Sequence, residues 1–326
     1  MQEPGCKSQV ARARLQQPAE GTTLYRGSGI TLMLTIMQRT AFAGAVAFLS
    51  IGAAPAPPMQ PLAERVTFAS ADGVTTLTGY LFRPETPAQA RAPAVVMMHG
   101  RGGAYSSLAN GDYGAATLSR RHQEWGHIWA QHGYFALMVD GFGPRGYAKG
   151  FPRFSYDERL KEVDEVNVRP LDAYGALLWL RKQPGVAGDR IALQGWSNGA
   201  SATLAAMAAK DVSGLGKLSR ENGFRAGLAF YPGCGLKDQF PDSLATYAPV
   251  RVFHGTADEE VSPRRCKTLV EKSRNSGADI DLTLYPDAEH GFDDPGSRRQ
   301  KSAANARAKV DAMAKAVSFI AEQLKQ

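Results

Sequence analysis

The sequence predicts an α/β fold, with a mostly parallel central sheet and helices on both of its faces. Short apolar runs, such as Ala94-Val95-Val96-Met97-Met98, alternate along the chain with longer stretches of helical periodicity. A continuous apolar run is typical of a strand buried on both faces, and its alternation with helices is typical of a parallel sheet. The carboxyl ends of such strands meet at one edge of the sheet, where we expect the functional residues.

The folded region is expected to begin with an antiparallel hairpin. Glu64–Ala69 and Thr76–Phe82 are extended runs, and Asp72-Gly73 between them is a turn signal. The later elements are expected, in chain order, as strand 94–98, helix 115–131, strand 134–139, helix 167–182, strand 190–193, helix 200–209, strands 228–231 and 250–253, helix 264–273, strand 281–285 and helix 303–324. Residues 144–160 show no regular pattern.

The stretch Gly195-Trp196-Ser197-Asn198-Gly199 joins a predicted strand to a predicted helix. In a Gly-x-Ser-x-Gly turn the serine hydroxyl is exposed at the carboxyl end of the strand, and the glycines let strand and helix meet closely. In isolation the pattern is equally typical of an ordinary strand-to-helix connection. A functional interpretation therefore needs a base and an orienting acid elsewhere in the chain.

Two later loops supply those partners. Asp258 follows the predicted strand 250–253, and His290 follows the next predicted strand. Each residue alone has a simpler interpretation, a turn cap for Asp258 and a surface histidine for His290. The order Ser197, Asp258, His290 is that of α/β-hydrolases, in which histidine activates the serine and the acid orients the histidine. We expect these three side chains to be catalytic.

Stabilisation of an oxyanion needs two hydrogen-bond donors. We expect the backbone N–H of Asn198, next to the nucleophile, and the backbone N–H of Arg101, in the loop His99-Gly100-Arg101-Gly102-Gly103 after strand 94–98. The same loop could be a plain flexible turn. A phosphate-binding loop is not expected, because the Gly-x-x-x-x-Gly-Lys pattern is missing. His99 and His254 each precede a glycine at a strand end, and we expect structural roles for them.

The motifs His99-Gly100, Gly195-x-Ser197-x-Gly199, His254-Gly255-x-x-Asp258 and Glu289-His290-Gly291-Phe292 together resemble the dienelactone hydrolase family. The resemblance covers roughly residues 63–325. It implies an α/β-hydrolase fold and a hydrolase for small carboxylic esters or lactones, without metal or organic cofactor. The founding members use a cysteine nucleophile, whereas position 197 is serine, so the resemblance does not extend to the dienelactone substrate itself.

Two other functions remain open at this point. A prolyl-oligopeptidase-like peptidase shares the triad order, although such enzymes usually carry an extra domain for which the chain offers no length. A non-catalytic binding protein could use the same fold, but it would not need all three triad residues. A nucleic-acid partner is not expected, because the net charge of +7 is scattered along the chain. No histidine cluster has metal-ligand spacing, and the sequence carries no signal for an oligomeric state.

The N-terminus predicts export. Residues 37–56 combine a positive start at Arg39, an apolar core and small residues for cleavage, so they resemble a signal peptide that is too short for a stable membrane span. Residues 1–36 are expected to be a mis-assigned or disordered extension, with the true start at Met33 or Met37. Residues 57–63 are expected to be a linker and 64–326 the hydrolase domain. We expect a periplasmic or secreted protein.

The cysteines agree with an oxidising compartment. Cys6 lies in the doubtful extension, which leaves the pair Cys234 and Cys266. Cys234 follows one predicted strand and Cys266 begins the helix after the Asp258 loop. Since those strands are expected neighbours, the pair is a candidate disulfide. The alternative is two free, buried thiols.

Overall fold

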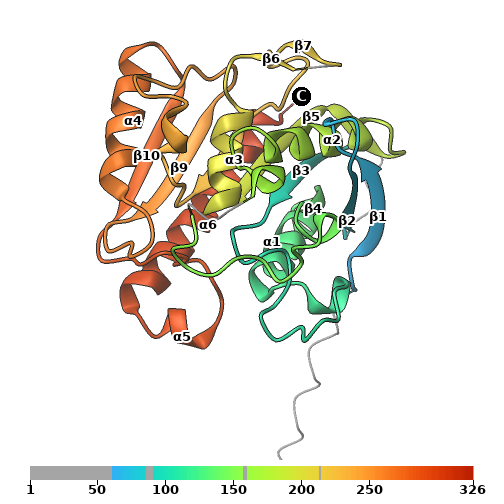
Figure 1. The fold of residues 1–326 in the computed structure, drawn as a ribbon, viewed down its shortest axis with the longest axis horizontal. Coiled ribbons are helices and arrows are strands. Elements are labelled where there is room, and N and C mark those ends of the chain that lie inside the picture. The colour runs from blue at the N-terminus through green and yellow to red at the C-terminus, as the bar shows by residue number, and fades with distance from the viewer. Residues whose placement is uncertain (1–60, 86–90, 157–159, 213, 326) are drawn as a thin grey trace, which may run out of the picture. The chain divides into compact units, whose positions relative to one another are not determined.

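An eight-stranded sheet forms the centre of the fold (Figure 1). The computed structural model describes residues 61–85, 91–156, 160–212 and 214–325. The order of strands across the sheet is β1-β2-β4-β3-β5-β8-β9-β10. The strands are β1 Glu64–Ala69, β2 Thr76–Phe82, β3 Ala92–Met98, β4 Phe135–Asp140, β5 Val186–Trp196, β8 Gly227–Phe230, β9 Val250–Gly255 and β10 Ile280–Tyr285.

The sheet is parallel except at one edge, as predicted. β1 and β2 form the expected antiparallel hairpin, and β2 also runs antiparallel to β4. Every other neighbouring pair in this sheet is parallel. The carboxyl ends of β3, β5, β8, β9 and β10 therefore lie at the same edge.

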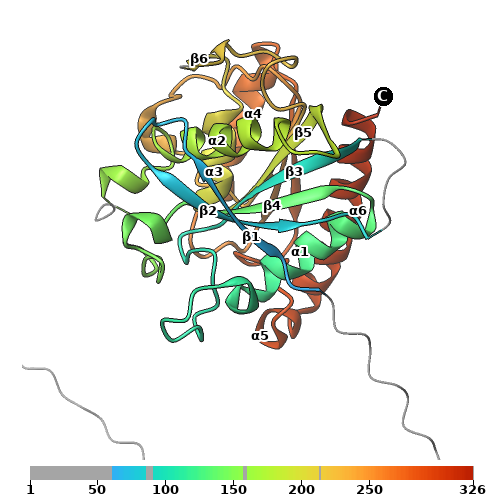
Figure 2. The same cartoon turned by 90° about the vertical axis from the view of Figure 1, so that its right-hand side faces the viewer.

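Helices cover both faces of the sheet (Figure 2). They are α1 Arg120–Gln131, α2 Arg169–Arg181, α3 Asn198–Ala206, α4 Pro263–Asn275, α5 Ser297–Gln300 and α6 Ala303–Gln323. Side chains of β3 alternate between two apolar cores, because successive residues of a strand point to opposite faces. Val96 and Met98 join the core under α2, α3 and α4, whereas Val95 and Met97 join the core under α1 and α6.

Two expected helices show the largest differences from their predicted boundaries. The region 115–131 divides into a 3₁₀ turn, Ala115–Thr117, and α1, because the Ser119 hydroxyl accepts a hydrogen bond from the N–H of His122 and starts a new helix. The helix expected over 200–209 ends at Ala206. Beyond it, the N–H of Ala209 donates to the carbonyl of Ala245, which draws the chain out of the helix.

Several small elements carry no clear sequence signal. β6 Asp211–Val212 and β7 Gly216–Lys217 form a separate two-stranded sheet. 3₁₀ turns occupy Gly143–Arg145, Lys161–Val163 and Leu236–Asp238. No helix in the described ranges is long and apolar enough to cross a membrane. The expected extension 1–36, the expected signal peptide 37–56 and the first part of the linker lie outside the described residues.

A disulfide joins Cys234 and Cys266, with their Cα atoms 4.9 Å apart. It connects the loop after β8 to the first turn of α4, which follows the Asp258 loop. The bond closes a segment with a sequence separation of 32 residues. Crosslinking a segment of this length reduces the entropy of the unfolded chain.

We therefore predict that the Cys234→Ser/Cys266→Ser double variant unfolds more easily than the parent protein. The free energy of unfolding should fall by about 3–4 kcal/mol, on the chain-entropy model. Urea unfolding with and without reductant measures it. Reductant should destabilise the parent protein and leave the double variant unchanged. Equal stability of the two proteins without reductant would contradict the prediction.

Candidate active site

Ser197 lies in a strained turn between β5 and α3. Its φ of 53° and ψ of −117° fall where residues with side chains are rare. The turn is held because the Ser197 N–H donates to the carbonyl of Phe230 over 2.9 Å. A Cβ atom on Gly195 would lie 2.2 Å from the Gly199 carbonyl oxygen, so this flanking position admits only glycine.

Ser197, His290 and Asp258 form one hydrogen-bonded chain. The distance from the Ser197 Oγ to the His290 Nε2 is 3.0 Å, and that from the His290 Nδ1 to the Asp258 Oδ2 is 2.8 Å. Asp258 follows β9 and His290 follows β10, so the parallel sheet brings the three residues to one edge. The spatial arrangement is the one expected from their order in the sequence.

The Asp258 carboxylate is buried and fully engaged. Its Oδ1 accepts hydrogen bonds of 2.9 Å from the N–H groups of Glu260 and Val261. Its Oδ2 contacts His290, and the His254 Nε2 lies 3.0 Å away. Burial alone would raise the pKa of Asp258, but its contacts with the two imidazoles and the backbone N–H groups lower the pKa well below its ordinary value. Asp258 is therefore ionised and oriented.

The loop after β3 runs directly beside the nucleophile. A Cβ atom on Gly100 would lie 3.4 Å from the Ser197 Cβ. Within the described chain, the Arg101 N–H donates to no protein acceptor. The Asn198 N–H is at the first position of α3, where helix N–H groups have no partner within the helix. The structure thus brings both expected oxyanion donors close to Ser197.

His99 orients this loop. Its Nδ1 lies 2.7 Å from the Gly100 carbonyl oxygen, and its Nε2 accepts a hydrogen bond from the Gly141 N–H. Burial is the main cause that lowers the pKa of His99 well below its ordinary value, and the positive charge of Arg169 lowers it further. The ring is therefore neutral with its proton on Nδ1. Because C=O and N–H point in opposite directions across a trans peptide, the Arg101 N–H points away from the His99 ring.

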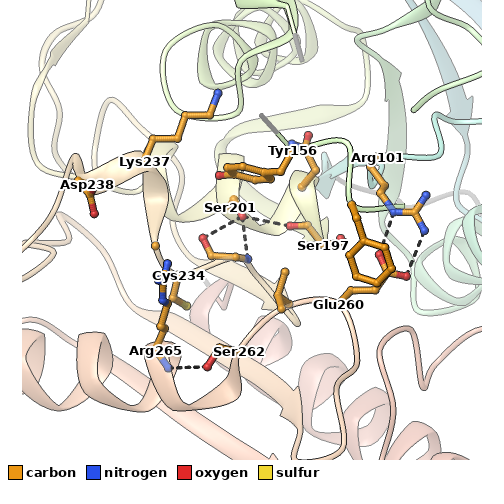
Figure 3. Close-up of a pocket in the computed structure, with 15 residues that line it drawn as sticks. Arg101, Tyr156, Ser197, Ser201, Cys234, Lys237, Asp238, Glu260, Ser262 and Arg265 are labelled. Carbon is orange, nitrogen blue, oxygen red and sulfur yellow. Dashed lines mark hydrogen bonds and ion pairs between the residues drawn. The ribbon is translucent and has the colours of Figure 1, made fainter. Parts of the chain in front are cut away.

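A cavity of about 760 Å³ opens beside Ser197 (Figure 3). Its lining is mixed: Phe154, Tyr156 and Val261 are apolar or aromatic, and Lys237 and Arg265 are cationic. Cys234 of the disulfide also belongs to the wall. Such a cavity has the dimensions of a small-molecule site.

Ion pairs line the rim of the site. The Arg101 guanidinium holds Glu260 through its Nε at 2.8 Å and its Nη2 at 3.1 Å, and Arg153 adds a contact of 2.6 Å. The Glu260 Oε2 lies 3.8 Å from the His290 Nε2. Burial alone would raise the pKa of Glu260, but the hydrogen bond from Arg101 and the charge of His290 outweigh it and lower the pKa to about 2.

A buried polar cluster packs against the His290 ring through Tyr231. The Tyr231 ring packs edge-on against the His290 ring at 4.7 Å, and its hydroxyl donates to the Asp293 Oδ1 over 2.5 Å. The indole N–H groups of Trp125 and Trp196 donate to the Asp293 Oδ2 over 2.9 and 2.8 Å. Asp293 is fully buried. Sequence reasoning missed this cluster, because its contacts join residues 62 to 168 positions apart.

Other groups near the site also escaped sequence reasoning. They are Glu165, Arg169 and Glu260, of which the first two are completely buried. Only Glu260 carried a signal, since it follows the predicted acid by two positions. In the described ranges, no cluster of three or more His, Cys, Asp or Glu side chains is placed to hold a metal ion.

Comparisons with known proteins identify a matching family. The model of the dienelactone hydrolase family matches residues 77–324. A probable dipeptidyl-aminopeptidase B of Uncinocarpus reesii is 26% identical over 216 residues, which cover 56% of this chain and 21% of that protein. The chain therefore spans about a fifth of the length of this curated relative.

Two solved structures share the fold. The esterase 2 of Thermogutta terrifontis, phosphorylated by paraoxon, aligns with a TM-score of 0.58 at 21% identity and covers 82% of this chain and 96% of its own. A dienelactone hydrolase-like promiscuous phosphotriesterase from metagenomic libraries aligns with a TM-score of 0.57 at 20% identity. The alignment covers 81% of this chain and 98% of that one. The match to the family model covers nearly the whole sheet and all three residues of the Ser197–His290–Asp258 chain. The protein belongs to the dienelactone hydrolase family.

Proposed function

We propose that this protein hydrolyses a small carboxylic ester or lactone through an acyl-enzyme on Ser197. Its family makes it a carboxylic ester hydrolase. The observation that carries the finer proposal is the Ser197–His290–Asp258 chain, with distances of 3.0 and 2.8 Å, at the edge of a 760 Å³ cavity. The cavity size favours a small substrate.

In the proposed mechanism His290 takes the Ser197 proton through Nε2 as the hydroxyl attacks the ester carbonyl, and then gives it to the leaving alcohol. In the second half, His290 takes a proton from water as the water attacks the acyl-enzyme, and then returns it to the Ser197 oxygen as the acid leaves. Asp258 keeps the other imidazole proton on Nδ1 and stabilises the cation that forms. The Glu260 carboxylate, 3.8 Å from Nε2, adds to that stabilisation. The N–H groups of Arg101 and Asn198 stabilise the oxyanion.

A peptidase activity is the second candidate. The specific observation in its favour is the 26% identity with a probable dipeptidyl-aminopeptidase. Peptides and esters pass through the same acyl-enzyme, so the triad alone does not discriminate between them. A parallel assay of short acyl esters, lactones and dipeptidyl amides distinguishes the candidates. A non-catalytic binding protein would leave all three classes uncleaved.

We further propose that the chain is exported to the periplasm or secreted. The support is the signal-like composition of residues 37–56, together with the disulfide between Cys234 and Cys266. Disulfides persist in oxidising compartments and are rare in the cytosol.

We predict that Ser197→Ala and His290→Ala each abolish most ester turnover. The two residues act as one unit, so the double variant should be no slower than either single variant. Asp258→Asn should fold normally and lose about 10⁴-fold in kcat, because the wrong imidazole tautomer is then favoured. Assays with p-nitrophenyl acetate and butyrate measure these effects.

Thr203→Ala serves as a matched control, because its hydroxyl is buried on α3 and donates to the Gly199 carbonyl within the same helix. This variant should keep its activity. A fluorophosphonate probe should label the parent protein and spare Ser197→Ala. Full ester turnover by Ser197→Ala, or activity that follows a bound metal, would refute the proposed mechanism.

We predict that the ionised rim glutamates stabilise the fold above about pH 4.5. Arg101 holds Glu260, and Arg299 holds the neighbouring Glu259 over 2.8 Å. Burial alone would raise the pKa of both carboxyl groups, but these contacts outweigh it and lower the pKa from 4.5 to about 2 in the folded protein. A lowered pKa means that this stability is complete above the unfolded value and is lost as the pH falls from 4.5 towards 2. The melting temperature of the parent protein should drop as the pH falls through that window. The drop should be smaller for Glu260→Gln, because glutamine does not titrate.

Glu271→Gln is the control, since Glu271 is an exposed residue of α4 outside the rim. This variant should show the same pH slope as the parent protein. A slope unchanged in Glu260→Gln would contradict the prediction.

We predict that the mature protein lacks residues 1 to about 56. Signal peptidase removes such segments during export. Intact-mass measurement of the protein purified from its native host, with the cellular fraction recorded, tests this. A mature N-terminus upstream of Met37 would refute it.

A further inference from the structure

Arg169 is a buried cation that contacts both halves of the proposed oxyanion hole. It is the first residue of α2 and is 0% exposed. Its Nη1 donates to the carbonyl oxygen of His99 over 2.8 Å and also to the Oδ1 of Asn198. The first acceptor belongs to the loop after β3 and the second to the residue after the nucleophile. One guanidinium thus joins two elements that each supply an oxyanion donor.

The bond to His99 determines the direction of a peptide plane. Arg169 holds the carbonyl of the His99–Gly100 peptide, and the His99 ring holds the carbonyl of the Gly100–Arg101 peptide. Together these two bonds orient the Arg101 N–H. The charge of Arg169 also disfavours protonation of His99, so the ring keeps the single Nδ1 proton that the second bond needs.

The bond to Asn198 fixes the other half. While its Oδ1 accepts from Arg169, its Nδ2 donates to the Glu165 Oε2 over 3.1 Å. Glu165 is fully buried, and the Lys237 Nζ lies 3.9 Å from the same oxygen. With both ends of its amide held, Asn198 has one orientation. Its backbone N–H is positioned with it.

Aromatic contacts hold the guanidinium itself in place. Its central carbon lies 4.9 Å from the centre of the Phe142 ring, and that ring packs edge-on against His99 at 4.4 Å. One packed unit next to the loop after β3 therefore contains Arg169, Phe142 and His99. Arg169 is shielded from solvent and is not among the described residues that line the cavity.

We propose that Arg169 is a positioning residue that sets the spacing and direction of the two oxyanion donors, the N–H groups of Arg101 and Asn198. The inference rests on the proposed function and assigns Arg169 no contact with substrate. Removal of one oxyanion donor typically costs 10²–10³-fold in kcat. Displacement of both donors by a fraction of an ångström should have an effect of similar size.

The test compares Arg169→Met with a matched control on the same helix, Arg181→Met. Arg181 donates to the carbonyls of Gly188 and Asn222 at the far end of α2. With p-nitrophenyl butyrate, Arg169→Met should lose about 10²-fold in kcat while KM changes less than about 3-fold. Its affinity for an alkyl boronic acid, which mimics the tetrahedral intermediate, should fall by a similar factor. Arg181→Met should lose stability and keep both values.

A double-mutant cycle with Asn198→Ala tests the shared bond. Asn198→Ala removes the side-chain acceptor and keeps the backbone N–H, so it should also lower kcat without raising KM. If the double variant loses no more kcat than the more affected single variant, the shared bond is supported. If the losses in the free energy of activation are strictly additive, the inference is overturned. If Arg169→Met does not fold, the kcat of Asn198→Ala decides alone, and a parent-like value overturns the inference.

Crystal structures of the variants give a readout that needs no turnover. The distance between the backbone nitrogens of Arg101 and Asn198 should change in Arg169→Met and stay the same in Arg181→Met. An unchanged distance would overturn the inference. Absence of ester hydrolysis by the parent protein would instead refute the proposed function, and this structural comparison would still decide the role of Arg169.

Discussion

Gly199 lets the first turn of α3 lie against the end of β3 at a distance that admits no side chain. A Cβ atom there would lie 2.1 Å from the carbonyl oxygen of Met98 and 2.5 Å from that of His99. This approach brings the strained Ser197 turn next to the loop that carries Arg101. The proposed nucleophile and both proposed oxyanion donors are therefore neighbours because two backbones touch.

The carboxylates of the site are paired with fixed protein groups. Asp258 is held by two imidazoles and two backbone N–H groups, and Glu260 by two arginines. Such preorganised groups need not reorient when charge develops during a reaction. The cost of burying them is offset by the hydrogen bonds that each one receives. The rim thus adds rigidity around His290 and holds the Glu260 carboxylate 3.8 Å from its Nε2.

The sequence predicted most of the sheet and the chain Ser197–His290–Asp258, because each of these features has a local signal. Buried strands are continuous apolar runs, and the three residues lie in loops or turns that follow strands, each with a glycine nearby in the sequence. Both antiparallel hairpin strands were likewise recognisable from alternation and a turn.

What escaped prediction depends on contacts between distant segments. Arg169 begins a helix that the sequence does predict, but nothing local says that its guanidinium is buried against residues 70 and 29 positions away. Glu165 lies in a stretch without periodicity. The two largest errors in helix boundaries, at Arg120 and Ala206, were decided by a cap and by tertiary hydrogen bonds that compete with the helix.

Asp293 links three elements of the interior through one buried carboxylate. One carboxylate accepts from two indoles and a phenol that come from α1, β5 and the end of β8, and Arg121 lies 3.2 Å from it. An asparagine there could keep its oxygen towards the two indoles and donate from its N–H₂ group to the Tyr231 hydroxyl, but that N–H₂ group would also face the Arg121 guanidinium, which has no acceptor. Trp125, Trp196 and Tyr231 are thus tied to Asp293 as a set. Exchange of this acid would therefore affect α1, β5 and the loop after β8 together, since each contributes a partner to the same carboxylate.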